Sequence, residues 1–146
     1  MNWDEYFLEI ADVVAKKSKD QSTKIGCVIV GPNNEIRSTG YNSFPRGIRD
    51  SLPERHERPE KYLWIEHAER NAIYNAARCG TSLEGCRIYV RAIPCMDCAR
   101  AIVQSGLVEV CYPKPDWKSE FAKRWEEQWE RTLTLFNEAG VKLRHV

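Results

Sequence analysis

Four residues in two short segments have the types and spacing of a metal-dependent hydrolytic site. His67 and Glu69 belong to the segment His-Ala-Glu, and Cys95 and Cys98 belong to Pro-Cys-Met-Asp-Cys. One imidazole and two thiolates are ligands that zinc prefers, and three protein ligands leave a tetrahedral zinc one position for water. Zinc lowers the pKa of bound water to about 7, which provides a nucleophile at neutral pH. We therefore predict a catalytic zinc site in which Glu69 is a nearby carboxylate and not a ligand.

The residues around both segments predict that the ligands lie at the starts of two helices. After His67, apolar residues recur at helical spacing as far as Gly80, a natural helix stop. Pro94 suits a helix entrance, and a second apolar face continues from it to Gly106. The two cysteines are then one turn apart and can reach the same metal. The positive ends of both helices favour thiolates and a hydroxide.

Simpler interpretations of the same residues are also open. A lone C-x-x-C can be a redox pair or half of a structural zinc site. A structural site needs a fourth Cys or His ligand, and none stands next to His67. Glu69 can also be a carboxylate that is stabilised by a helix dipole. The remaining cysteines have apolar or strand-like surroundings and are predicted to be ordinary buried thiols: Cys27, Cys79, Cys86 and Cys111.

Composition places the chain among intracellular enzymes. We expect one domain, residues 1–146, for a chain of 146 residues. Six cysteines, two of them needed as thiolates, predict a reducing, cytoplasmic location. The amphipathic N-terminus indicates a first helix and not a signal peptide, and no apolar run approaches the ~20 residues of a membrane span. A net charge of +1 argues against a nucleic-acid partner bound mainly through its backbone.

Helices and strands are predicted to alternate along the chain. This order predicts an α/β fold, a three-layer α/β/α domain with a central mixed sheet of about five strands, in which parallel crossovers follow an antiparallel hairpin. The zinc site then lies where two helix starts meet at strand ends. The expected helices cover residues 3–17, 67–79, 94–105 and 117–139, and the expected strands cover 25–30, 35–41, 87–90, 108–112 and 141–146.

Aromatic and aliphatic residues recur every three or four positions in the last helix. This spacing is more typical of a core or of a subunit contact than of a base-stacking platform. The residues are Phe121, Trp125, Trp129, Leu133 and Phe136.

Over nearly its whole length the sequence resembles the cytidine deaminase-like superfamily. The resemblance is carried by SKDQSTKIGCVIV at 18–30, GYNSFPRG at 40–47, KYLWIEHAERNAIYNAAR at 61–78 and PCMDCARAIVQSG at 94–106. All branches share the zinc motifs, including the guanine, tRNA adenosine and riboflavin-pathway deaminases. GYNSFPRG and HAERNAI look most like the deoxycytidylate (dCMP) deaminase branch.

The resemblance implies Zn²⁺ as cofactor and dCMP as substrate. His67, Cys95 and Cys98 would hold the zinc, and Glu69 would act as base and then as acid while dCMP becomes dUMP, a precursor for thymidylate. The alternative is a related zinc deaminase that acts on another base, nucleoside or nucleotide, such as guanine, cytosine or tRNA adenosine. A zinc scaffold without activity is a third interpretation, against which Glu69 argues.

Five further positions are expected to bind the nucleotide by the same resemblance. Asn42 and Ala68 match positions near the base or sugar, while Ser22 and Lys24 lie where family members place part of the phosphate site. Asn42 can also be a turn asparagine, which is the less favoured interpretation, and Lys24 can equally be a solvated loop charge. Trp117 stands near a tyrosine that closes over the nucleotide in many dCMP deaminases; tryptophan stacks on a ring but has a different donor geometry.

The long 43–66 loop suggests a function beyond a simple connection. Its cations are matched by acidic residues, so it is not a basic patch. In regulated family members this region helps to bind dCTP, which makes dCTP and dTTP candidate allosteric effectors, and His56 alone is poor evidence for a second zinc. Family members are usually homo-oligomers, often hexamers, so we expect an oligomer.

Overall fold

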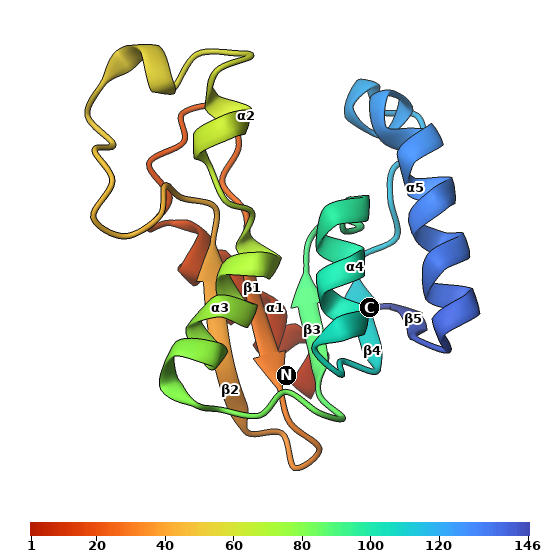
Figure 1. The fold of residues 1–146 in the computed structure, drawn as a ribbon. Helices are drawn as coiled ribbons and strands as arrows, with labels where there is room; N and C mark the ends of the chain where they lie inside the picture. The colour runs from red at the N-terminus through yellow and green to blue at the C-terminus, as the bar shows by residue number, and fades with distance from the viewer.

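Five strands form one mixed sheet in a computed structural model that describes residues 1–146, apart from the side chain of Phe121 (Figure 1). The strand order is β2-β1-β3-β4-β5. β1 pairs antiparallel with β2 and β3, and β3, β4 and β5 are parallel, which confirms the predicted hairpin followed by parallel crossovers. The strands are β1 (Gly26–Val30), β2 (Ile36–Tyr41), β3 (Arg87–Val90), β4 (Glu109–Tyr112) and β5 (Lys142–His145).

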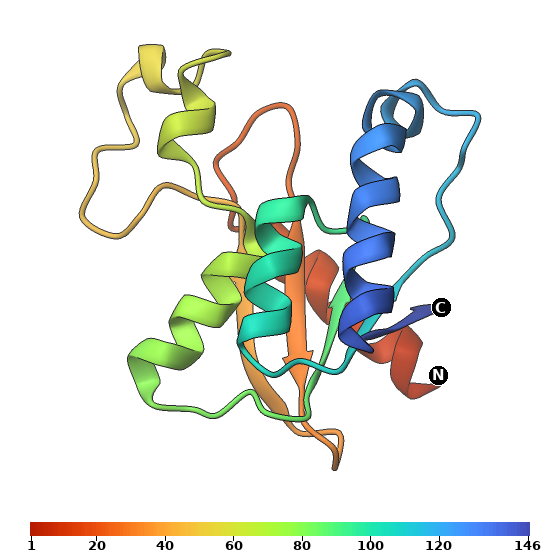
Figure 2. The same cartoon turned by 45° about the vertical axis from the view of Figure 1, so that its right-hand side comes forward.

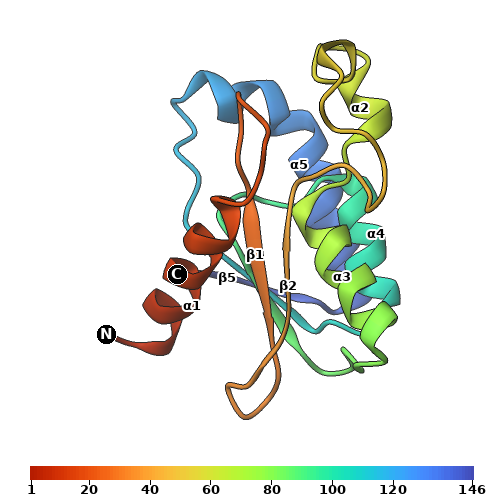
Figure 3. The ribbon, with the colours of Figure 1, turned by 90° about the vertical axis from the view of Figure 1, so that its left-hand side faces the viewer.

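Helices cover both faces of this sheet and make the predicted three layers (Figure 3). β1 is buried along its whole length, as expected for a continuous apolar strand that is covered on both sides. The larger core cluster lies under three of the helices and the smaller one under the first helix. Among the described residues, no helix is both long and apolar enough to cross a membrane. The helices are α1 (Trp3–Ala15) on one face and α3 (Ala68–Cys79), α4 (Met96–Gln104) and α5 (Glu120–Ala139) on the other.

Close packing of α3 on β2 sets the position of the first zinc segment. A Cβ added at Gly40 of β2 would lie 2.3 Å from the carbonyl oxygen of Ala68 and 2.4 Å from the backbone nitrogen of Ala72, so only glycine fits there. Ser38 Oγ also donates a hydrogen bond of 2.6 Å to the Ala72 carbonyl. The start of α3 is therefore fixed against the sheet.

The long loop after β2 contains two short helices, η1 (Pro53–Arg55) and α2 (Lys61–Trp64). Its two ends are joined by an antiparallel bridge, in which the amide of Ser43 donates to Glu66 at 3.1 Å and the amide of Glu66 donates to Ser43 at 2.8 Å. The segment extends beyond one end of the sheet (Figure 2). Because the bridge directly precedes His67, the loop begins and ends beside the first zinc segment.

The predicted bounds of the first and last helices differ from the observed ones. α1 ends at Ala15, two residues before the predicted end, and α5 begins at Glu120, three residues after the predicted start. The start of α5 is set by Ser119, whose hydroxyl accepts a hydrogen bond of 3.0 Å from the amide of Ala122. A serine N-cap is a local signal that apolar periodicity does not report.

Candidate active site

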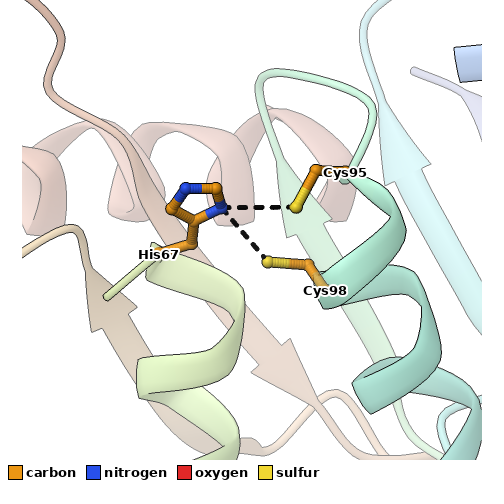
Figure 4. Close-up of side chains that lie close together, drawn as sticks. All are labelled: His67, Cys95 and Cys98. Atoms are coloured by element: carbon orange, nitrogen blue, oxygen red, sulfur yellow. Dashed lines mark hydrogen bonds between the residues drawn. The ribbon is translucent and has the colours of Figure 1, made fainter. Parts of the chain in front are cut away.

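The starts of α3 and α4 bring the three expected metal ligands together (Figure 4). His67 is the N-cap of α3 and Cys95 the N-cap of α4, and Cys98 lies one turn into α4. His67 Nδ1 is 3.4 Å from Cys95 Sγ and 3.5 Å from Cys98 Sγ. The two helix starts therefore converge as the sequence predicted.

The donor set and its spacing fit a zinc ion. Zinc–nitrogen and zinc–sulfur bonds in a tetrahedral site place nitrogen and sulfur ligands about 3.6 Å apart, close to both distances here. The three ligand atoms lie within 4.8 Å of one another, and among the described residues no other group of His, Cys, Asp or Glu has this arrangement. Three protein ligands leave one tetrahedral position open, which is typical of catalytic and not of structural zinc.

The two thiols interact strongly, and their ionisation favours a bound cation. The hydrogen bond from Cys98, together with His67, lowers the pKa of Cys95 to about 4. The same hydrogen bond and burial raise the pKa of Cys98. Cys95 is thus a thiolate at neutral pH, while a second thiolate beside it is opposed by the first. A divalent cation removes this opposition, because it attracts both sulfurs.

Glu69 places a carboxyl group next to the ligands without being one of them. Its residue is only 6 % exposed and lies in the first turn of α3. Burial raises the pKa of Glu69, while the nearby His67 opposes the shift. A carboxyl group whose pKa is raised by burial binds a proton more readily than an exposed glutamate, which suits a group that takes up and releases protons.

α5 holds the segment that precedes the cysteine pair. The hydroxyl of Thr132, which is fully buried, donates a hydrogen bond of 3.0 Å to the carbonyl oxygen of Pro94. Arg70 in α3 also forms ion pairs with Glu66 and with Asp97 of α4. The two ligand helices are therefore tied to each other and to α5.

The site opens into a cavity of about 620 Å³. His67, Glu69 and Cys95 lie on its wall, whereas Cys98 is buried behind them. Ala68 and Asn42, which the resemblance placed near the base or sugar, also line this cavity. The volume is within the usual range for small-molecule sites.

Asn42 has a structural task as well as a place on the cavity wall. Its side-chain oxygen accepts from the amide of Ile25 at 2.9 Å, and its side-chain nitrogen donates to the carbonyl of Thr23 at 2.8 Å. Only 8 % of the residue is exposed. These bonds fix the loop before β1, and each end of the amide keeps one further hydrogen-bonding position.

The other expected substrate residues lie off the cavity wall. Lys24 is exposed, and Trp117 is 43 % exposed and packs edge-on against Trp129 at 5.3 Å between ring centroids. The hydroxyl of Ser22 accepts a hydrogen bond of 2.9 Å from Lys61. None of the three is among the residues that line the cavity, whereas Trp129 and Lys61 are.

The sequence missed that α5 forms a wall of this cavity. The expected core position is confirmed for Trp129 and Phe136, which are buried, while the side chain of Phe121 lies outside the described residues. Trp125 and Trp129 nevertheless also face the cavity, together with Arg124, Gln128 and Arg131. No local signal in the sequence shows this, because the spacing of the apolar residues is the same for a helix face that also borders a cavity.

A second cavity, of about 500 Å³, lies beside the long loop. Residues 44–48 form part of its wall, and it has cationic side chains from α3, from the segment after α1 and from the long loop. Asp20, Asn42 and Ile65 line both cavities, so the two share a wall. The cations on its wall are Lys17, Lys19, Arg46 and Arg78.

The fold and the site define a class of protein, and a family model identifies it. A model described as the cytidine and deoxycytidylate deaminase zinc-binding region matches residues 1–114. The match includes β1–β4, α3, α4 and the three metal-site residues. The chain therefore belongs to this family of zinc-dependent deaminases, which confirms the resemblance and the zinc cofactor.

Individual relatives match almost the whole chain. Human deoxycytidylate deaminase is 36% identical over 151 residues, which cover 99% of this chain and 79% of the human protein. An uncharacterised deaminase from the luxG 3′ region of Aliivibrio fischeri is 40% identical over 141 residues, covering 97% and 91%. The crystal structure of dCMP deaminase from the cyanophage S-TIM5, in complex with dCMP and dUMP, has a TM-score of 0.75 at 23% identity and covers 97% and 95%. This last likeness confirms the fold.

Proposed function

We propose that this chain is a dCMP deaminase that converts dCMP and water to dUMP and ammonia, as one catalytic domain over residues 1–146. One observation carries the proposal: His67, Cys95 and Cys98 converge beside the buried carboxyl of Glu69, on the floor of a cavity with the volume of a small-molecule site. The human relative that matches 99% of this chain is a deoxycytidylate deaminase, which supports dCMP as the substrate.

In this proposal His67 Nδ1 and the two cysteine sulfurs hold the zinc, with Arg70 and Thr132 keeping the helices that carry them in place. Zinc bound there would make water acidic enough to act as a nucleophile at neutral pH. Ala68 and Asn42 line the same cavity as His67 and Cys95, and the pyrimidine and sugar would bind against them. The remaining hydrogen-bonding positions of Asn42 suit that role.

Glu69 moves the protons of the reaction. It accepts a proton from the attacking water and delivers it to the ring nitrogen next to the amino-bearing carbon. It then takes the proton of the hydroxyl that is now on this carbon and transfers it to the amine, which leaves as ammonia while the carbonyl of dUMP forms. A buried carboxyl with a raised pKa can do both, because it binds protons more readily than an exposed glutamate.

Ammonia release from dCMP by the zinc-loaded protein tests the proposal. Cytosine, deoxycytidine, CMP, guanine and a tRNA anticodon stem-loop are assayed in parallel, each with and without dCTP. Fast turnover of dCMP and slow turnover of the others is the expected result. No turnover of dCMP, with turnover of any other substrate, would show a related deaminase instead.

We further propose that the second cavity binds dCTP or dTTP as an allosteric effector. Its cations can meet a triphosphate, and its shared wall with the catalytic cavity gives a physical route for the effect. Binding of dCTP to the dCMP-free protein, weakened by Arg46→Met, tests this. An equal affinity in the variant would contradict it.

Assembly and location complete the proposal. Exposed apolar residues on α1 and α2, including Trp3 and Leu63, support a homo-oligomer, and the hexamer that is frequent among family members is the form we propose. All six cysteines are free, which supports a reducing cytoplasm. Light scattering of the purified protein tests the assembly, and a cytoplasmic reporter fusion tests the location.

A further inference from the structure

Lys61 is an unusual residue for the wall of the catalytic cavity, because it is a lysine that is only 7 % exposed. It begins α2, the short helix that lies beyond the N-terminal end of α3 (Figure 1). Lysine is almost never buried unless its charge has partners. The partners of Lys61 therefore indicate what the residue does there.

Two acceptors hold the ammonium group of Lys61 and leave one of its protons unused. Lys61 Nζ donates to Ser22 Oγ at 2.9 Å and to Asp20 Oδ2 at 3.3 Å. An ammonium has three N–H donors, so one donor remains among the contacts of the described residues. Since the residue lies on the cavity wall, an acceptor on a bound ligand can take this third hydrogen bond.

Asp20 forms most of its hydrogen bonds within the loop before β1 and one with Lys61. Its Oδ1 accepts from the amide of Ser22 at 2.9 Å, the hydroxyl of Ser22 at 2.9 Å and the amide of Thr23 at 3.1 Å. Burial opposes ionisation, but the hydrogen bonds from Thr23 and Ser22 hold the pKa of Asp20 below its usual range. These three donors offset much of the carboxylate charge, so Lys61 keeps part of its attraction for another anion.

The cavity wall as a whole is more basic than the sequence suggests. Five cations line it, together with the carboxyl groups of Asp20, Glu69 and Asp97 and the thiol of Cys95. Two of these cations already have acidic partners, because Arg70 pairs with Glu66 and Asp97, and Arg131 pairs with Glu127. The acidic residues that match the loop cations along the sequence do not line this cavity: Asp50, Glu54, Glu57, Glu60 and Glu66. The cations are Arg58, Lys61, Arg70, Arg124 and Arg131.

We propose that Lys61, held in place by Ser22 and Asp20, is the residue that recognises the phosphate group of the nucleotide in the catalytic cavity, with Arg58 adding positive charge at the same wall. The inference rests on the proposed function, because that function supplies the phosphate-bearing substrate. Lys24, which the resemblance placed at the phosphate, is exposed and lies off this wall. Lys61 thus takes the phosphate-binding role that the resemblance had assigned to Lys24.

Binding of dUMP, measured by calorimetry on zinc-loaded Lys61→Met, tests the inference without turnover. A charge-assisted hydrogen bond is worth about a 10- to 100-fold change in affinity, and we expect a loss of this size for dUMP. In turnover, the loss should fall on KM for dCMP, while kcat/KM for deoxycytidine, which has no phosphate, stays constant. Lys16→Met is the matched control, since Lys16 is exposed and lines neither cavity.

The variant set separates recognition from a structural role. Removing one member of a buried ion pair can unfold a protein, so Asp20→Asn combined with Lys61→Met removes both charges together. Unchanged dUMP affinity in both Lys61 variants would overturn the inference, as would an equal loss of kcat/KM on dCMP and deoxycytidine. A loss of dUMP affinity in Lys24→Met, with none in Lys61→Met, would also overturn it.

The same measurements distinguish the inference from the proposed function. If dUMP binds through Lys61 but dCMP is not deaminated, the proposed function fails and the phosphate site remains. If dCMP is deaminated and dUMP affinity does not depend on Lys61, the proposed function stands and the assignment of Lys61 to the phosphate fails. Absence of dUMP binding to the unchanged protein would overturn the inference.

Discussion

Ionisable side chains gather on both faces of the sheet, and the two clusters differ in how their members are satisfied. On the α1 face, Tyr89 donates a hydrogen bond of 2.6 Å to Asp4, and Arg144 binds both oxygens of the same carboxylate at 2.7 and 3.1 Å. Arg87 donates to Tyr89 at 2.9 Å, and Arg144 also reaches Glu109 at 3.2 Å. Each charge in this cluster has an opposite charge or a hydrogen-bond partner beside it.

On the other face, the cluster of His67, Glu69, Cys95 and Cys98 lacks such balance. It contains three groups that become anionic and one imidazole, and burial opposes the charge on Glu69. The thiols lie close to each other and to the imidazole, and Cys98 also forms a hydrogen bond with Glu69, so no cationic side chain other than His67 is hydrogen-bonded to them among these contacts. An anionic cluster of this kind has to bind a cation or protons, whereas the cluster on the α1 face is already neutralised.

The comparison shows that polarity and burial alone do not identify an active site. Both clusters are partly buried and rich in charge, and both have shifted pKa values. The difference is that the second cluster lies beside a cavity and contains ligand atoms and anionic groups that can still bind a cation. On this basis the α1 cluster links the two ends of the chain through Asp4 and Arg144, and the other cluster is the candidate catalytic site.

The largest expected difference between the clusters comes from removing one thiol from each. Cys98→Ala should lose zinc and reduce turnover to the background rate, because a site with two ligands holds zinc poorly. Cys111→Ala, on the α1 side, should keep zinc and turnover and lower the free energy of unfolding by about 1 kcal/mol. Zinc analysis and ammonia release measure both, and loss of zinc in Cys111→Ala would contradict the distinction.

Glu69→Gln should reduce turnover without reducing zinc binding. The amide keeps the size of the side chain but cannot carry protons, so turnover should fall by about 10²- to 10⁴-fold. Zinc content should stay at the level of the unchanged protein, because Glu69 is not a ligand. A variant that retains full turnover would show that another group transfers the protons.

Arg144→Met tests whether the α1 cluster is structural. It removes hydrogen bonds to a carboxylate that is about a third exposed, so the free energy of unfolding should fall by about 1–2 kcal/mol. Turnover of the folded protein should not change. Arg91→Met is the control, because its pair with Asp12 is about half exposed on both sides and should contribute less than about 1 kcal/mol. Urea unfolding compares the two variants.

The smallest expected effect is on how the free energy of unfolding depends on pH, through Asp4 in the cluster on the α1 face. The hydrogen bond from Arg144 holds the pKa of Asp4 below its ordinary value of 3.8. The group therefore contributes stability above the unfolded pKa, and this contribution is lost as pH falls through the lower folded pKa. In zinc-free protein, the gap in unfolding free energy between the unchanged chain and Asp4→Asn should shrink from pH 5 to pH 3. A constant gap would contradict this assignment.

Much of the metal site could be predicted because its signals are local. Cys95 and Cys98 are one helical turn apart whatever the rest of the fold does, and Glu69 follows the histidine by two residues. The strand and helix alternation likewise follows from apolar runs and from glycine and proline positions. The bounds that failed, such as the start of α5 at Glu120, depend on a cap that periodicity does not show.

The walls of the cavity could not be predicted in the same way. The spacing of Trp125 and Trp129 shows that they share one face of α5, but not that this face also borders a cavity. Thr132 contacts the carbonyl of Pro94 across 38 positions of sequence, a contact that no local pattern reports.

The amino-acid sequence by itself determined the family, the zinc ligands and the alternation of elements, because each depends on residues within one or two helical turns. The tertiary structure alone decided which cations line the cavity beside the candidate metal site. Along the chain, the 43–66 loop is nearly neutral, yet Lys61 and Arg58 face the catalytic cavity and the matching acidic residues do not. Side-chain direction depends on how α2 packs against the loop before β1, and the sum of charges along a sequence contains no information on that packing.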